Sequence, residues 1–356
     1  MKRSIADIKA NIADLAAGMP PITIMEVCGT HTVNIRRFGL QMLLPENIRL
    51  ISGPGCPVCV TAGADVAYAL DIAAQHGVIF TCFGDMLRVP CGKRTLYSLY
   101  EEGYDIRMVE SPLDALAIAQ ANPNRDTVFF GVGFETTAPL TATLIRSARE
   151  HGISNLSVLS AHKTMPAAIT DLLDGGANVD ALLCPGHVAA LTGANAFNFV
   201  ASTLKLPAAI SGFTADDIMV AILYLTYLCR SKVPRCVNLY PRAVSAAGNA
   251  LARSIVDDVF EPADATWRGL GVIAQSGLKI REAYRDFDAL ARFSPPRYTE
   301  NEIPGCLCGS ILRGEAIPSS CTNFGNACVP DHPLGACMVS SEGTCAAYYR
   351  YGGELY

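Results

Sequence analysis

Short apolar runs alternate along the chain with longer stretches in which apolar residues recur every three or four positions. The runs contain four to six residues and many β-branched side chains, which is typical of strands buried on both faces of a sheet. Helical spacing is clear at residues 64–75, 139–149 and 166–173. Nine strands are expected, at 22–27, 48–52, 78–82, 106–109, 128–132, 156–160, 181–184, 208–211 and 271–275. The alternation predicts an α/β fold of βαβ units with parallel sheets.

An internal similarity indicates that the α/β part contains two lobes. A shift of 131 positions aligns Val27–His31 (VCGTH) with Val158–His162 (VLSAH), and Leu50–Cys56 (LISGPGC) with Ala181–His187 (ALLCPGH). Two histidines and two Pro-Gly pairs then coincide without a gap, which supports two similar lobes around a cleft. The expected division is an N-terminal helix at 1–20, a first lobe at 21–122, a second lobe at 123–240 and a C-terminal domain at 241–356.

Charge and hydropathy exclude several classes of protein. The 356 residues carry a formal net charge of −5 without a run of Lys or Arg, so neither nucleic acid nor an anionic membrane is an expected partner. Residues 5–15 have the spacing of an amphipathic helix and do not resemble a signal peptide. The best candidate for a membrane span, Ile218–Cys229, is too short and is expected to be a buried helix. We therefore expect a cytoplasmic protein.

The fourteen cysteines are informative because a reducing cytoplasm does not usually keep structural disulfides. Isolated cysteines such as Cys82, Cys229 and Cys236 are interpreted as small buried hydrophobic residues. Six others lie between residues 306 and 345, in a segment rich in Gly and Pro that follows a helical stretch at 243–259. Such a segment is typical of a small domain organised by a metal site.

Four of these cysteines have a spacing that favours a metal cluster. Intervals of six, eight and seven residues, each with Gly or Pro, separate Cys321, Cys328, Cys337 and Cys345. Zinc ribbons prefer Cys-x₂-Cys pairs, which this segment lacks, whereas four thiolates on long loops suit an iron–sulfur cluster. Zinc, disulfides and a purely structural role remain open, and Cys306-Leu-Cys308 is an alternative pair of ligands.

Another pair of cysteines, Cys56 and Cys59, lies on a tight loop between an expected strand and an expected helix. The pair is interpreted as a redox dithiol, as half of a zinc site, or as two small buried residues. Loop amides or a helix N-terminus can stabilise one thiolate of such a pair. An iron–sulfur cluster in the same chain favours the redox interpretation, because a cluster can supply electrons to a disulfide.

Cys28 and His31 follow the first expected strand. Gly29 after the thiol leaves room for a ligand, and Thr30 and His31 could orient it. The Cys28/His31 pair also resembles a nucleophile with its base. A cysteine and a histidine that belong only to the core are the alternative.

Further polar residues follow other expected strands, at the carboxyl edge where open α/β sheets bind ligands. Asp85 and Arg88 follow one strand, and a structural ion pair between them is the alternative interpretation. Glu135 and Thr136 follow the next and are expected to face the cleft. Cys184–His187, the counterpart of the dithiol loop, lacks the second thiol and is interpreted as structural or interface-forming.

Longer motifs carry a family resemblance. They are MEVCGTHT from Met25, SGPGCPVCVT from Ser52, FGDMLRVP from Phe83, GFETTAP from Gly133, CPGHV from Cys184, and NFGNACVPDHPLGACMVSSEGTCAAYYRY from Asn323. In these motifs the sequence resembles the HypD family of [NiFe]-hydrogenase maturation proteins, over roughly residues 5–352. The resemblance implies two similar α/β lobes and a third domain with a [4Fe-4S] cluster.

The resemblance also implies a function, which is that of a redox-active assembly scaffold rather than a conventional turnover enzyme. Together with a small HypC-type partner, such a scaffold holds an iron ion that receives two cyanides and one carbon monoxide. HypE delivers the cyanide and is itself supplied by HypF. The finished Fe(CN)₂CO group then passes to the hydrogenase large subunit.

Residue roles follow from the matching motifs. The resemblance implies that Cys28 is a thiolate ligand of the iron, with Cys56 and Cys59 as the redox dithiol at the same metal site. It implies that the four spaced cysteines hold the cluster, and that further residues line the iron cleft: His31, Asp85, Glu135 and Thr136. The competing hypotheses are a thiol–disulfide oxidoreductase similar to ferredoxin–thioredoxin reductase, and a non-catalytic iron–sulfur scaffold.

Overall fold

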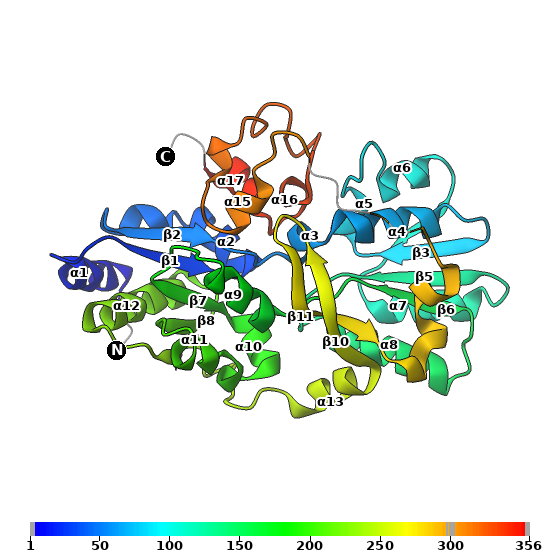
Figure 1. The fold of residues 1–356 in the computed structure, drawn as a ribbon, viewed down its shortest axis with the longest axis horizontal. Coiled ribbons are helices and arrows are strands. Elements are labelled where there is room, and N and C mark those ends of the chain that lie inside the picture. The colour runs from blue at the N-terminus through cyan, green and yellow to red at the C-terminus, as the bar shows by residue number, and fades with distance from the viewer. Residues whose placement is uncertain (1–3, 297, 299–302, 353–356) are drawn as a thin grey trace.

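The computed structural model describes residues 4–296, 298 and 303–352. Its strands form two parallel sheets and one antiparallel hairpin (Figure 1). The strands are β1 (Ile22–Glu26), β2 (Ile48–Ser52), β3 (Val78–Cys82), β4 (Asp105–Met108), β5 (Asp126–Gly131), β6 (Leu156–Ser160), β7 (Ala181–Pro185), β8 (Ala208–Ser211), β9 (Cys236–Asn238), β10 (Phe260–Trp267) and β11 (Gly271–Ile280). The predicted α/β class with parallel sheets is confirmed.

Helices connect most of the strands. In the α/β part they are α1 (Ile5–Ala16), α2 (Gly29–Arg37), α3 (Pro57–Val60), α4 (Gly63–Ala73), α5 (Gly84–Leu87), α6 (Leu96–Glu101), α7 (Pro112–Ala121), α8 (Ala138–Glu150), α9 (Met165–Asp174), α10 (Gly186–Thr192), α11 (Asn198–Ser202) and α12 (Ala215–Ser231). Later helices are α13 (Ala250–Val259), α14 (Ala289–Phe293), α15 (Cys308–Leu312), α16 (Ala336–Val339) and α17 (Thr344–Tyr351). Short 3₁₀ turns are η1 (Leu40–Leu43), η2 (Ala194–Phe197), η3 (Glu282–Phe287) and η4 (Pro318–Ser320).

Both sheets are covered by helices on their two faces, which explains why the strands are almost continuously apolar. In β1, Ile24 belongs to a core formed with α1 and α12, whereas the next residue, Met25, belongs to a core formed with α9, α10 and α11. In β5, Phe129 packs with α7 and α8, and Phe130 packs with α4 and α6. Successive side chains of one strand therefore fill two different cores.

The two lobes share one topology, but the second lobe is an insertion into the first. The sheet orders are β2-β1-β7-β8-β9 and β4-β3-β5-β6. In each lobe the first strand therefore has the second strand on one side and the third strand on the other, and the fourth strand pairs with the third. Residues 78–160 form the second sheet without interruption, between β2 and β7. Similar α/β lobes are thus present, but the sheets divide the chain differently from the expected boundaries at 21–122 and 123–240.

The shift of 131 residues does not relate the two lobes either. It aligns β1 with β6 and β2 with β7, and β2 and β7 lie in the same sheet on either side of β1. The sequence comparison failed because neighbouring parallel strands are joined by a crossover connection. The length of such a connection does not show which strand pairs with which. The connection from β2 to β7, the next strand of the first sheet, spans residues 53–180 and contains the whole second lobe.

Two helix predictions are confirmed. Helix α1 begins with a capping box between Ser4 and Asp7 and buries Ile8 and Ile12 against α12. Helix α12 contains the apolar stretch from Ile218 and is largely buried. Among residues 4–296, 298 and 303–352, no helix is long and apolar enough to cross a membrane.

The β10–β11 hairpin lies between the lobes and is drawn in yellow in Figure 1. Residues 271–275 were expected to be a strand, but β10 was not predicted, and the helix expected from residue 243 begins only at Ala250. Isolated β-bridges join Trp267 of the hairpin to Thr61, and Gly277 to Lys163. The hairpin therefore contacts the segment after α3 and the loop after β6.

Residues 303–352, here called the Cys-rich segment, contain only short helices and turns. The segment lies above the junction of the two lobes in Figure 1. Its helix α16 packs on α3, and its helix α17 packs on α2. The Cys-rich segment is thus placed directly over the two loops that carry Cys28 and the dithiol.

Candidate functional site

A cleft of about 480 Å³ lies where the carboxyl ends of the two sheets face each other. The loops after β1 and β7 contribute Cys28 and His187, and the loops after β3 and β5 contribute Asp85 and Thr136. In each lobe these are the first and third strands, which are neighbours in the sheet, and the second strand lies on the other side of the first. Open α/β sheets bind ligands at this position, and here two such positions share one cavity.

Cys28 is held at the start of α2 by its backbone. Its N–H donates to the Glu26 carboxylate at 3.0 Å, and the next N–H, of Gly29, donates to the carbonyl of Gly55 at 2.9 Å. A Cβ atom at Gly55 would overlap the backbone of Cys28, so only glycine allows this approach. Burial, with the nearby charges of Glu26 and Glu342, raises the pKa of the Cys28 thiol to about 12. The free thiol is therefore protonated at neutral pH.

Glu26 is a buried carboxyl group that our sequence reasoning missed. It is 2% exposed and accepts hydrogen bonds from the Cys28 N–H and the Thr32 hydroxyl. Burial raises its pKa to about 7, although these hydrogen bonds oppose the shift. The signal was available, because Glu26 is the one charged residue in an apolar strand, β1.

Cys56 and Cys59 form a disulfide across the first turn of α3, with their Cα atoms 5.3 Å apart. Cys56 occupies the N-cap position, and its sulfur accepts a hydrogen bond from the Cys59 N–H at 3.2 Å. Both residues are buried, in the same apolar cluster as Cys337 of the Cys-rich segment. Pro57 and Val58, which lie between the two cysteines, line the cleft beside Cys28. The disulfide is thus located between the cleft and the Cys-rich segment.

His31 does not line the cleft, contrary to expectation. It is fully buried, and its Nε2 lies 2.9 Å from the Gly212 carbonyl oxygen, so its ring is directed away from the cavity. Burial lowers its pKa to about 4. His187 lines the cavity instead and stacks on Phe213, with 3.9 Å between ring centroids. The Cys184–His187 motif, interpreted as structural, therefore contributes an imidazole to the cleft.

Asp85 and Thr136 line the cleft as expected, whereas Glu135 does not. Glu135 accepts a hydrogen bond from the N–H of Met165 at 2.9 Å, in the first turn of α9, and burial raises its pKa to about 7. Its second oxygen is buried and has no hydrogen-bond partner among the described residues. The ion pair between Asp85 and Arg88 is not formed, because Arg88 donates to the carbonyl of Pro330.

The Cys-rich segment closes the cleft through one short loop that the sequence reasoning also missed. The Ser340 hydroxyl donates to Asp85 at 2.9 Å, and the Thr30 hydroxyl donates to the Glu342 carboxylate at 2.6 Å. One loop therefore contacts both lobes, because Asp85 follows β3 and Thr30 follows β1. Glu342 lies between Cys337 and Cys345 in the sequence, so the same loop adjoins the predicted cluster cysteines.

The six cysteines of the Cys-rich segment influence one another electrostatically. The sulfurs of Cys308 and Cys337 lie 3.3 Å apart, and this contact together with burial raises the pKa of Cys337 well above its usual range. The pKa of Cys345 is raised by burial and by four of the other cysteines. Among the residues that the structure describes, no group of three or more His, Cys, Asp or Glu side chains is arranged to hold a single metal ion. A polynuclear cluster spreads its thiolates around several irons, and a gathering of buried and half-buried thiols fits that chemistry.

Fold and site together define an α/β protein in which a thiol-lined cleft between two lobes adjoins a cysteine-rich segment. The family model described as HypD, hydrogenase formation hypA family, matches residues 3–352. The hydrogenase maturation factor HypD of Rhodobacter capsulatus is 43% identical over 360 residues, covering 99% of this chain and 95% of that protein. The same factor of Escherichia coli K12 is 43% identical over 333 residues, covering 93% and 89%.

A relative from an archaeon gives the same result. A putative hydrogenase expression/formation protein of Methanocaldococcus jannaschii is 38% identical over 340 residues, covering 96% of this chain and 95% of that protein. The chain belongs to the HypD family of hydrogenase formation proteins, as the sequence motifs indicated.

Proposed function

We propose that this protein is a scaffold for the assembly of the Fe(CN)₂CO group of a [NiFe]-hydrogenase. The observation that carries the proposal is the cleft itself, in which a cysteine at the end of β1 lies beside a disulfide and below the Cys-rich segment. Iron is the cargo of this site. Cys28 provides its thiolate, and the thiols of Cys56 and Cys59 adjoin the same position after reduction. Soft thiolate ligands suit an iron that is to bind cyanide and carbon monoxide.

We assign the transfer of the Cys28 thiol proton to the carboxyl groups that lie near it. Cys28 holds a proton at neutral pH and must release it when iron binds, because the thiolate is the metal ligand. The Cys28 N–H and Thr32 hydroxyl orient Glu26 beneath it, and Glu342 faces it from the Cys-rich segment. His187 and Asp85 offer further polar groups toward ligands that enter the cleft. Gly29 and Gly55 allow two close approaches around Cys28, because a Cβ atom would overlap Glu342 at Gly29 and the Cys28 backbone at Gly55.

The cofactor proposed for the Cys-rich segment is a [4Fe-4S] cluster held by Cys321, Cys328, Cys337 and Cys345. When bound, such a cluster supplies single electrons. The disulfide between Cys56 and Cys59 takes up two electrons and two protons to become two thiols. The packing of α16 on α3 brings the segment that contains Cys337 against the dithiol turn.

The partners proposed are a small HypC-type protein that shares the iron at Cys28, and HypE, which delivers cyanide together with HypF. The hydrogenase large subunit is the indirect recipient. Relatives that are 38–43% identical are named as hydrogenase maturation or hydrogenase expression/formation proteins, which supports this assignment.

Infrared spectroscopy tests the proposal directly. The protein is purified anaerobically after co-expression with its small partner and the cyanide-delivery proteins, and Cys28→Ala is compared with Cys229→Ser, a control on α12 away from the cleft. We expect cyanide and carbonyl stretching bands in the parent protein and the control, and none in Cys28→Ala. A parent protein that contains iron but shows no such bands would refute the scaffold function.

The second candidate function is a thiol–disulfide oxidoreductase. The contact between the dithiol turn and the Cys-rich segment favours it over a purely structural role for Cys56 and Cys59. It predicts that reduced protein transfers electrons from these two thiols to a protein disulfide, and that Cys28→Ala retains this activity. A non-catalytic iron–sulfur scaffold instead predicts that replacing Cys56 and Cys59 leaves the infrared bands intact.

A further inference from the structure

Arg268, at the tip of the β10–β11 hairpin, is a buried cation outside the cleft. It is 8% exposed, its backbone N–H donates to the Val60 carbonyl at 2.9 Å, and its Nε donates to the Thr61 carbonyl at 2.9 Å. Among the described residues, its buried Nη2 has no hydrogen-bond partner and no carboxylate forms an ion pair with its guanidinium group. An arginine does not lose its charge at any physiological pH, so the buried charge remains uncompensated.

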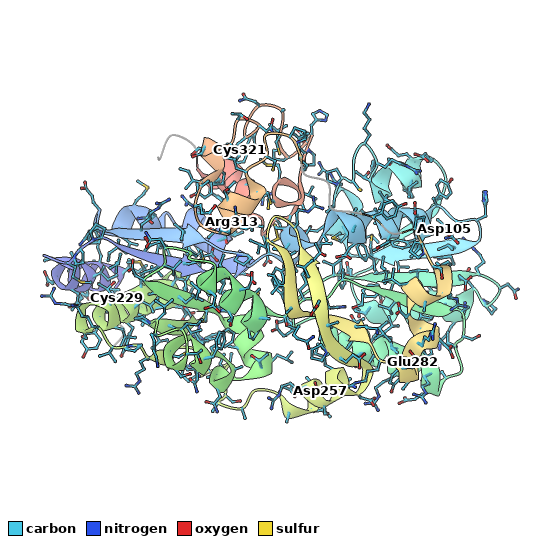
Figure 2. All side chains as sticks on the ribbon, viewed as in Figure 1. Asp105, Cys229, Asp257, Glu282, Arg313 and Cys321 are labelled. Atoms are coloured by element: carbon cyan, nitrogen blue, oxygen red, sulfur yellow. A yellow bond between two sulfur atoms is a disulfide. The ribbon has the colours of Figure 1, made fainter. Side chains whose placement is uncertain are left out.

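A second cavity, of about 420 Å³, lies beside Arg268. Its walls include side chains from the hairpin tip and from the Cys-rich segment: Trp267, Arg268, Cys306, Cys308, Ser310 and Arg313. Arg313, labelled in Figure 2, joins these two parts of the chain, because its Nη1 donates to the Gly269 carbonyl at 2.9 Å.

The two arginines of the cavity differ in one respect that matters for binding. Arg313 forms an ion pair with Glu315 at 2.8 Å, so its charge is balanced within the protein. The charge of Arg268 has no such partner among the described residues. The cavity therefore has one uncompensated positive charge with an unsatisfied N–H group, plus the Ser310 hydroxyl as a further donor. Guanidinium groups of this kind bind carboxylates and phosphates through paired, charge-assisted hydrogen bonds.

We propose that this cavity is a binding site for a small oxyanion, either a carboxylate or a phosphate, with Arg268 as its principal anchor. The proposal does not rest on the function assigned to the cleft, because none of the residues that line this cavity lines the cleft. Occupation of the site satisfies the unpaired Nη2 of Arg268, and it also fixes the hairpin tip against the Cys-rich segment.

Trp267 makes the site accessible to measurement. It is the only tryptophan of the chain, it is fully buried, and it lines the cavity. Its emission is recorded on the anaerobically purified full-length protein while inorganic phosphate or acetate is titrated at an ionic strength held constant with chloride. We expect a saturable change in the Trp267 emission with each oxyanion, because an anion beside Arg268 alters the charge next to the indole.

Three variants locate the effect. Arg268→Gln is expected to weaken the binding of phosphate and acetate about tenfold, which corresponds to about 1.4 kcal/mol. Arg268→Lys keeps the charge without the planar fork and is expected to retain saturable binding at lower affinity, which guards against a folding defect in the glutamine variant. Arg285→Gln, at an exposed arginine that does not line the cavity, is expected to behave like the parent protein.

Two results would overturn the proposal. One is a parent protein whose Trp267 emission changes with neither phosphate nor acetate, as expected if metal-bound thiolates of the Cys-rich segment already balance Arg268. The other is equal binding of the oxyanions by the parent protein and by folded Arg268→Gln, which indicates nonspecific binding of anions elsewhere.

Discussion

Glu135→Gln should remove the contribution of Glu135 to the pH dependence of stability in this protein. Burial raises the pKa of Glu135 to about 7 from a reference value of 4.5, and no residue in the described part of the chain hydrogen-bonds to one of its carboxylate oxygens. The folded state therefore holds the proton more tightly than the unfolded chain does. The stabilisation is complete below the unfolded pKa and is lost as the pH rises through the folded pKa. A shift of this size corresponds to about 3 kcal/mol between pH 4.5 and pH 7.

Glutamine keeps the acceptor for the N–H of Met165 and cannot ionise. The free energy of unfolding of Glu135→Gln minus that of the parent protein should therefore increase by about 3 kcal/mol as the pH is raised from about 5 to about 8. Urea titrations followed by Trp267 fluorescence measure this difference, because Trp267 stacks on the neighbouring Phe134. Glu102→Gln, at an exposed carboxylate, is the control and should show no gain. An equal stability difference at both pH values would contradict the assigned burial of the Glu135 charge.

Other substitutions test separate parts of the structure. Gly55→Ala should displace the backbone of Cys28 and abolish the infrared bands of the iron group, while the far-UV circular dichroism spectrum stays unchanged. Intact infrared bands would show that the close approach of Gly55 to Cys28 is not needed. Ile12→Ala should lower the free energy of unfolding by about 2–5 kcal/mol in urea, because the side chain is fully buried between α1 and α12, and a loss under about 1 kcal/mol would argue against that packing. Cys321→Ser should reduce the iron and sulfide content after anaerobic purification, whereas Cys229→Ser should not, and equal contents would remove Cys321 from the proposed cluster ligands.

The strands could be predicted well from the sequence, but their partners could not. β2, β3, β6 and β8 have the predicted bounds, because strands buried on both faces are unbroken apolar runs. Which of them pair depends on contacts between residues far apart in sequence. β10 was missed because its sequence, FEPADATW, contains proline and small polar residues and lacks the apolar signal of the other strands.

The same limit applies to the site. The carboxyl-edge rule correctly placed Cys28, Asp85 and Thr136 at one cavity, because it depends only on where a strand ends. It could not decide which of two histidines faces that cavity, since both follow strands and only the packing around Phe213 separates them. Glu342 could not be assigned either, because its position depends on how the Cys-rich segment sits on the lobes.

The inserted lobe has a consequence for biosynthesis. During translation β1 and β2 leave the ribosome early, but β7, the strand that pairs with the other side of β1, follows only after the whole inserted lobe. At about 5–20 residues per second this delay is roughly 8–30 s. Throughout that interval one edge of β1 is an open template for pairing with a foreign strand. Nascent chains of this protein are therefore vulnerable to aggregation at β1, and a chaperone that covers residues 22–26 would relieve it.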